Sequence, residues 1–227
     1  MRFSAAMLVA CCLVISTSAK AQIAPSSTEI STYLGLHAAA QEGNAKLIRQ
    51  LISLGRDVEL KDSYGRTPLH VAVFGSHANA VKALAESKAD LNALENDAYD
   101  AITIAAVAND VEMIKLLLSL GANSGNITSP YDGTALIAAA HLGHFEVVRI
   151  LAEAGAPLDH VNNLGWTALI EAVVLGDGGP RHVKTSAALI EAGADISVPD
   201  RQGVTPLEHA RSRGYTDMVA RFPQVSE

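Results

Sequence analysis

Apolar residues recur along this chain at helical spacing, in short segments that come in pairs. The first segment of a pair is rich in small residues, as in Ala38 to Ala40, and a turn such as Gly43-Asn44 follows it. The second segment has a stronger apolar stripe, for example Leu47, Ile48, Leu51 and Ile52. Spacings of three and four place such side chains on one face of a helix. The pattern therefore predicts a chain of paired helices.

The pairs repeat at a nearly constant interval. The segment Thr67-Pro68-Leu69-His70 recurs at residues 134–137, 167–170 and 205–208, with weaker copies at 34–37 and 100–103. Threonine is a preferred N-cap, and proline fits the first turn of a helix. The fourth positions of the copies are His37, His70, Thr103, Ile137, Ile170 and Glu208, so that only the last step is clearly longer. This periodicity indicates a solenoid, in which each unit buries its apolar face against its neighbours.

These segments resemble the ankyrin repeat. Thr67-Pro68-Leu69-His70-Val71-Ala72 matches the signature segment of that family, while residues 143–148 and 153–156 match the start of its second helix and the end of its repeat. The resemblance covers residues 31–222 and implies about six helix pairs, end caps included, with short β-hairpin or turn fingers along one edge. The expected fold is therefore an all-α repeat solenoid.

Residues 1–21 have the three parts of a secretory signal peptide. Met1 and Arg2 begin it, an apolar stretch runs from Phe3 to Ile15, and Ala19-Lys20-Ala21 is a small-x-small cleavage site. The apolar stretch is shorter than the roughly 20 residues that a membrane-spanning helix needs. We expect a bacterial Sec-type signal cleaved after Ala21, with the mature protein in the periplasm or the medium. Lipoprotein processing at Cys11 stays open, because residues 8–11 resemble a lipobox.

Composition and charge narrow the classes of partner. The chain is 49% hydrophobic and 18% charged, which is too apolar for intrinsic disorder. Cleavage after Ala21 would remove both cysteines and two basic residues, changing the net charge from −7 to −9 and leaving no membrane span. The acidic balance argues against nucleic acid, since phosphate binding needs a basic patch. Residues 22–30 are expected to be a flexible lead-in, and residues 223–227 a short tail.

Two departures from the repeat pattern are candidates for specialised function. The longer last step comes from an inserted segment, residues 176–182, between the two helices of one repeat. We expect an enlarged surface turn there, with Pro180 beginning the next helix. A ligand-binding or enzymatic role for this segment is an alternative, but a phosphate-binding loop needs glycine where Val183 stands before Lys184. The third copy has Ala98 and Asp100 in place of glycine and threonine, which indicates either drift or a reshaped finger.

The sequence contains no recognisable catalytic, cofactor or metal site. His37 and His70 occupy the signature position of the repeat, and His77 and His144 stand at the starts of second helices. No third ligand stands at metal spacing from His141 and His144. A Gly-x-Ser-x-Gly elbow and a His-Glu-x-x-His pair are also absent. We therefore expect a non-enzymatic protein without cofactors.

Protein binding is the positive expectation. The ankyrin resemblance implies that a partner meets the fingers and the exposed positions of the first helices, on a concave face. Tyrosine and tryptophan are enriched at binding hot spots. The candidate contact residues are Tyr64, Tyr99, Tyr131 and Trp166 on the fingers, with Phe74, Val107, His141, Leu142, Val174 and Leu175 on the first helices. The alternative for the aromatic residues is packing within the fold.

The predicted function is thus that of an exported, monomeric module for protein–protein interaction. A secreted effector acting on host proteins shares the fold and remains the alternative.

Overall fold

The computed structural model describes residues 22–223. The expected signal peptide, the cysteines within it and all but Pro223 of the expected tail lie outside this range. The described helices are α1 (Ser27–Thr32), α2 (Gly35–Gln41), α3 (Ala45–Ser53), α4 (Pro68–Phe74), α5 (Ala78–Glu86), α6 (Ala101–Val107), α7 (Val111–Ser119), α8 (Ala135–His141), α9 (Phe145–Glu153), α10 (Ala168–Val174), α11 (Pro180–Glu191), α12 (Pro206–Ser212) and α13 (Thr216–Val219). No described helix is both long and apolar enough to cross a membrane.

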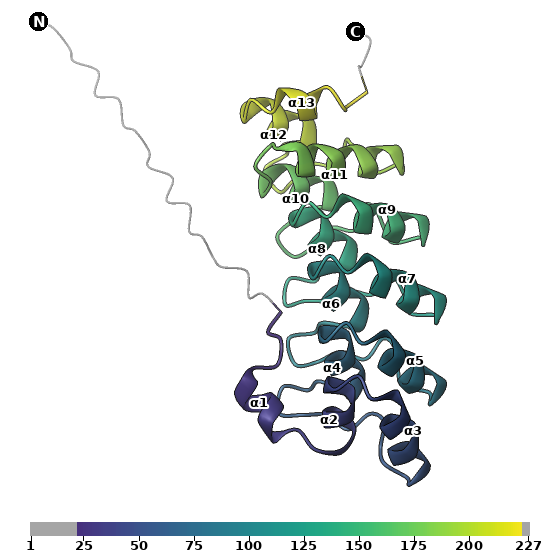
Figure 1. Ribbon diagram of the computed structural model, residues 1–227. Helices are drawn as coiled ribbons and strands as arrows, with labels where there is room; N and C mark the ends of the chain where they lie inside the picture. The colour runs from purple at the N-terminus through teal and green to yellow at the C-terminus, as the bar shows by residue number, and fades with distance from the viewer. Residues whose placement is uncertain (1–21, 224–227) are drawn as a thin grey trace, which may run out of the picture.

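Apart from α1, the helices form pairs that stack in chain order, from α2 and α3 at the purple end to α12 and α13 at the yellow end (Figure 1). The first helix of each pair, here called the inner helix, packs on the inner helix of the next pair, and the second is called the outer helix. The core runs through the whole stack and is built from small and branched aliphatic side chains such as Ala72, Ile104 and Leu151. The predicted all-α repeat solenoid is confirmed.

The inner helices begin at the caps that the sequence predicts. Thr67, Thr134, Thr167 and Thr205 are N-caps, and in the third repeat Asp100 takes this place. Asp100 Oδ1 accepts hydrogen bonds from the backbone N–H of Thr103 at 2.8 Å and from its hydroxyl at 2.6 Å. The departure of the third copy from threonine therefore preserves the cap, because either side chain can satisfy a free N–H group of the first turn.

Each finger is a turn whose first side chain holds the backbone. In the first finger, Asp62 Oδ1 accepts hydrogen bonds from the N–H groups of Tyr64 and Arg66, both at 2.9 Å. In the later fingers, too, the first side chain accepts hydrogen bonds from the N–H groups of the third and fifth residues. These first residues are Glu95, Ser129, Asn162 and Asp200. Among the described residues, Thr128 and Gly133 form the one isolated β-bridge, so the fingers are turns more than hairpins.

Histidines join successive repeats at the turn between the two helices of a pair. His77 Nε2 bonds the carbonyl oxygen of Gln41 at 2.8 Å, and His144 Nδ1 bonds that of Ala106 at 3.0 Å. His182 Nε2 bonds that of His141 at 3.0 Å. Each carbonyl lies in the last turn of an inner helix, where carbonyl groups lack the regular helical partner four residues further on. His77 and His144, which the repeat pattern places at the starts of second helices, thus make contacts between repeats.

The inserted segment is absorbed mainly by a longer helix. α11 begins at Pro180, as predicted, and has 12 residues where α3, α5, α7 and α9 have nine. Asp177 Oδ1 accepts hydrogen bonds from the backbone N–H of Gly179 and from His182 Nδ1, both at 2.9 Å. Because α11 starts early, His182 still reaches the preceding repeat. The segment differs in this respect from the simple enlarged turn expected from the sequence.

The buried ring of His70 is held in one tautomer. Its Nδ1 accepts a hydrogen bond from the backbone N–H of Thr67 at 3.1 Å, so the proton of the neutral ring is on Nε2. Nε2 then donates to the carbonyl oxygen of Ala93 at 3.0 Å and lies 3.3 Å from that of Tyr99. Protonation of Nδ1 would place its hydrogen against the N–H hydrogen of Thr67 inside the core.

Mild acid should therefore destabilise the protein through His70. Burial lowers the pKa of this ring below its ordinary value, so near pH 6 the unfolded chain binds a proton that the folded chain does not. The free energy of unfolding should have its full value above about pH 6.5 and should decrease as the pH falls below that value. Urea unfolding at several pH values measures this dependence.

The matched variants are His70→Gln and His160→Gln, of which the second alters an exposed finger contact. We expect His70→Gln to reduce the change of stability between about pH 7.5 and pH 5.5. His160→Gln should retain it. An equal pH dependence in all three proteins would show that His70 is not responsible.

Candidate functional site

The exposed ends of the inner helices form a continuous row. Phe74, Val107, His141 and Val174 are the last residues of α4, α6, α8 and α10, and none of them is fully buried. Leu142 and the exposed Leu175 follow directly. Because consecutive inner helices pack side by side, these side chains lie on one face, which we call the inner-helix row. The structure thus brings together the candidate residues predicted on the first helices.

The four finger aromatics occupy two different positions, which the sequence analysis treated as equivalent. Tyr64 and Tyr131 stand third in their fingers, where Tyr64 is 44% exposed and Tyr131 is half-buried. Tyr99 and Trp166 stand fifth, directly before the cap of an inner helix. Trp166 is half-buried, whereas Tyr99 is buried in the core. The expectation that Tyr99 is exposed on its finger is therefore wrong, because its side chain is 7% exposed and belongs to the hydrophobic core.

A polar link connects a finger to the inner-helix row in the fifth repeat. The buried Asn162 receives the N–H groups of Leu164 and Trp166 on its Oδ1, and its Nδ2 donates to Glu171 Oε1 at 2.9 Å. On the other side, Glu171 Oε2 lies 3.3 Å from His141 Nδ1. The link therefore runs from the finger that carries Trp166, through a carboxylate on α10, to His141 at the end of α8.

Asn162 and Glu171 were not among the residues predicted for the site. The repeat alignment contains a signal for Glu171, because the corresponding positions in three other repeats are Val71, Ile104 and Ala138. A carboxylate on a buried helix face, at a position that is apolar in the first four repeats, is unusual and indicates a special role. Asn162 could not be distinguished in the sequence from the other residues that begin the fingers.

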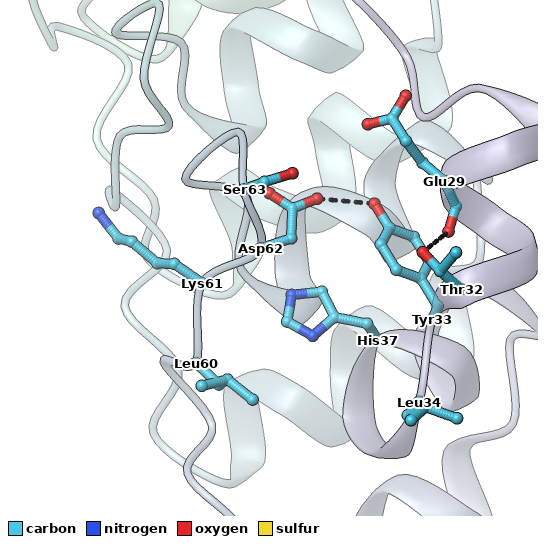
Figure 2. A pocket seen from close by; sticks show the side chains of 9 residues that line it. All are labelled: Glu29, Thr32, Tyr33, Leu34, His37, Leu60, Lys61, Asp62 and Ser63. Carbon is cyan, nitrogen blue, oxygen red and sulfur yellow. Dashed lines mark hydrogen bonds between the residues drawn. The ribbon is translucent and has the colours of Figure 1, made fainter.

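A second candidate site is a cavity of about 290 Å³ at the first repeat (Figure 2). Its wall includes Tyr33, whose hydroxyl donates to Asp62 Oδ2 at 2.8 Å, and His37, whose Nε2 bonds the carbonyl oxygen of Arg66 at 2.9 Å. Two exposed leucines, Leu34 and Leu60, also line it. The polar groups named here already bond one another, so the cavity does not present a free set of ligand-binding atoms.

Arg66 is the centre of the polar cluster behind this cavity. Its side chain is 1% exposed, and its Nε donates to Asp62 Oδ2 at 2.8 Å. Its two terminal nitrogens bond the carboxylate of Glu29 in α1 and the carbonyl oxygen of Ile23 at 3.3 Å. The guanidinium also lies 4.5 Å from the ring centre of Tyr64. The cluster therefore fastens the beginning of the described chain to the first finger.

This attachment corrects the expectation of a flexible lead-in over residues 22–30. The helix α1 begins at Ser27, within that range, and Ser26 and Glu29 form a capping box at its start. The sequence-based interpretation was wrong because Arg66, from the finger that follows the first helix pair, supplies the charge that holds Glu29.

Electrostatics within the cluster favour the ionised form of Asp62. Burial alone would raise the pKa of this carboxyl, but hydrogen bonds from Tyr33, Arg66 and Tyr64 outweigh it, and the net pKa is lowered. Burial and the same hydrogen bond to Asp62 raise the pKa of the Tyr33 phenol. Asp62 therefore stays charged and Tyr33 stays protonated around neutral pH, which keeps the cluster intact.

Metal binding has no support in the described part of the chain. Within residues 22–223, no group of three histidine, cysteine or carboxylate side chains could hold a metal ion. The inner-helix row and the polar link instead place partly exposed apolar side chains beside one buried carboxylate. Repeat stacks commonly bind partners over such extended surfaces.

Stacked helix pairs with finger turns and a partly exposed inner-helix row define this chain as a helical repeat solenoid. The sequence matches the family model for ankyrin repeats (3 copies) over residues 36–128 and 103–200, so the chain belongs to the ankyrin-repeat family. Ankyrin repeats generally act in protein–protein interaction, and the fold is generally non-enzymatic.

Known proteins of similar sequence and structure agree with this assignment. The ankyrin repeat protein YahD of Escherichia coli K12 is 30% identical over 182 residues, covering 80% of this chain and 90% of its own. A solved ankyrin repeat domain from Acinetobacter baumannii AYE is 39% identical, with a TM-score of 0.77, and covers 82% of this chain and 94% of its own.

A third similarity is to a chain in the solved complex of the predatory endopeptidase Bd0816 of Bdellovibrio bacteriovorus with the immunity protein Bd3460. That chain is 26% identical, with a TM-score of 0.68, and the match covers 83% of this chain and 96% of that one.

Proposed function

We propose that this protein is exported and binds another protein through the inner-helix row and the adjoining fingers, without catalysing a reaction. The observation that carries the proposal is the row itself. Phe74, Val107 and Val174 are apolar residues at the ends of successive inner helices, and each is left partly exposed although the core beneath is complete. Exposed apolar positions that lie in a line favour contact with a partner.

The row can be tested by placing charge on it. Val107→Lys and Val174→Lys should together abolish capture of the partner from periplasmic extract or from the medium, because binding would bury two ammonium groups. The matched control is Leu54→Lys, since Leu54 is 70% exposed in a turn after an outer helix. The control should capture the partner as the unaltered protein does, and equal capture by the row variant would contradict the proposal.

An exported endopeptidase is the first class of partner to test. This suggestion rests on the similarity to a chain in the complex between an endopeptidase and an immunity protein. Endopeptidases secreted by the source organism would be mixed with the purified protein and assayed for association and for peptide hydrolysis. Unchanged hydrolysis together with no association would remove this class, while leaving other protein partners open.

Export itself is testable by intact mass. We expect a mature protein that begins at Gln22, recovered from the periplasm or the medium. A protein that retains Met1 in the cytoplasm would contradict export, and a lipid-modified Cys11 would support the lipoprotein alternative. Recovery mainly from the medium or from host cells would favour an effector acting on host proteins.

A further inference from the structure

The carboxylate of Glu171 is buried but only half satisfied. Its side chain is 5% exposed, and Oε1 accepts the hydrogen bond from Asn162 described above. Oε2 has no hydrogen-bond donor within the described residues, although His141 Nδ1 is 3.3 Å away. A buried carboxylate oxygen without a donor lowers stability, so its presence calls for an explanation.

Other buried carboxylates of the fold do not share this shortage. Asp100 uses Oδ1 for Thr103 and Oδ2 for Asn126 Nδ2, which lies 2.9 Å away. Asp200 uses Oδ1 for the backbone of its finger and Oδ2 for His209 Nε2 at 2.7 Å. Both are caps or turn residues that the fold requires. Glu171 is neither a cap nor a finger residue, and only its Oε1 contributes to the fold, through Asn162. Valine, isoleucine and alanine serve at the same position of three other repeats.

The Oε2 atom of Glu171 lies beside His141, a member of the inner-helix row. His141 covers it, and the side chain of His141 is 37% exposed at the end of α8. Within residues 22–223 the one polar contact given for the His141 ring is that with Glu171 Oε2, so a cation that replaces the ring there exchanges a single contact. Leu142, Val174 and Leu175 stand next to it at the ends of α8 and α10, and all three are at least partly exposed.

We propose that Glu171 binds a basic side chain of the protein partner in the place that the His141 ring now occupies, an inference that rests on the proposed function. A lysine ammonium or arginine guanidinium displaces the His141 ring and pairs with Glu171 Oε2, which gains the donor it lacks. The aliphatic stem of the same side chain packs on Leu142, Val174 and Leu175, as the stems of lysine and arginine do on apolar surfaces. The net charge of −7 favours approach of a basic partner.

A charged donor fits this site better than a neutral one or a metal ion. The charge of Glu171 is compensated fully only by an opposite charge, and ion pairs with hydrogen bonds are the stronger kind. A metal ion would need further ligands, and the described residues hold no group that supplies them.

The first experiment uses small probes and does not depend on knowing the partner. N-acetyl-arginine methylamide is titrated into the purified protein while NMR follows the His141 ring and the indole N–H of Trp166, the one tryptophan of the chain. We expect saturable shifts at millimolar probe, the affinity range of a single small cation. The citrulline counterpart, which has the same shape without the charge, should give none.

The variant for both experiments is Glu171→Gln, because its amide oxygen can still accept the bond from Asn162. It should unfold at the same urea concentration as the unaltered protein, or at a higher one, and lose the response to the arginine probe. Glu191→Gln, at the exposed end of the outer helix α11, is the matched control and should retain the response. Equal shifts with citrulline, a response retained in Glu171→Gln, or no saturable shift would each overturn the site.

The second experiment uses the partner captured through the inner-helix row. Glu171→Gln should weaken binding at least ~30-fold, since the partner's cation is left buried without its counter-charge, while Glu191→Gln has no effect. If Glu171→Gln binds normally and the lysine variants of the row do not, the proposed function stands and this site is wrong. If all variants bind normally, both are wrong.

Discussion

Arg66→Met should lower the free energy of unfolding by about 3 to 5 kcal/mol, the cost of breaking a buried ion pair by removing one partner. Methionine keeps much of the volume of arginine but cannot bond Asp62, Glu29 or the carbonyl oxygen of Ile23. Asp62 would keep its backbone donors and Tyr33, yet it would lose its counter-charge inside the fold. Urea unfolding followed by circular dichroism measures the change.

The matched control for Arg66 is Lys61→Met, directly before the same finger. Lys61 is exposed and donates one hydrogen bond to the carbonyl oxygen of Leu94, so its loss should cost less than about 0.5 kcal/mol. Arg66→Met should also expose residues 22–32 to limited proteolysis, because the guanidinium holds them on the first finger. Equal stability of the two variants, with unchanged proteolysis, would contradict the role of the cluster.

Tyr99→Ala should destabilise the protein to a similar extent, by about 3 to 5 kcal/mol, because it leaves a cavity the size of an aromatic ring in the core. Tyr99 is 7% exposed, and its carbonyl oxygen also accepts a hydrogen bond from the backbone N–H of Glu95 at 3.1 Å. Thermal and urea unfolding measure the effect.

Tyr64→Ala is the matched control, since Tyr64 is the most exposed of the finger aromatics and should cost less than about 1 kcal/mol. The comparison separates packing from binding. If Tyr99→Ala unfolded like the unaltered protein but failed to capture the partner, Tyr99 would be a contact residue. Packing in the core would then not be its role.

The repeat architecture was predictable from the sequence because each unit carries the same local signals. Threonine caps, the signature segment around His70 and the apolar stripes all act within one unit, and the next unit repeats them. Helix starts such as Pro180 were found for the same reason. These features are determined by residues close together in the sequence, so they can be recognised in one sequence alone.

What could not be predicted depends on contacts between distant residues. Nothing near Glu29 indicates that Arg66 binds it, and the alternation of exposed and buried positions within a finger becomes visible only when the turn geometry is known. Tyr64 and Tyr99 look alike in sequence but differ in exposure for that reason. In the candidate site, His141 was found from its place in the repeat, whereas Asn162 and Glu171 gain meaning only from their mutual contact.

The links between repeats use the backbone of one unit and the side chain of the next. The carbonyl groups that accept from His77, His144 and His182 belong to Gln41, Ala106 and His141, which share no side-chain chemistry. The side chain of the accepting residue can therefore change by mutation while the hydrogen bond between the two repeats is kept. His141 illustrates the outcome, because its carbonyl oxygen secures the next repeat while its imidazole is available to face Glu171. A stack joined in this way can acquire new specificity at the ends of its inner helices one residue at a time.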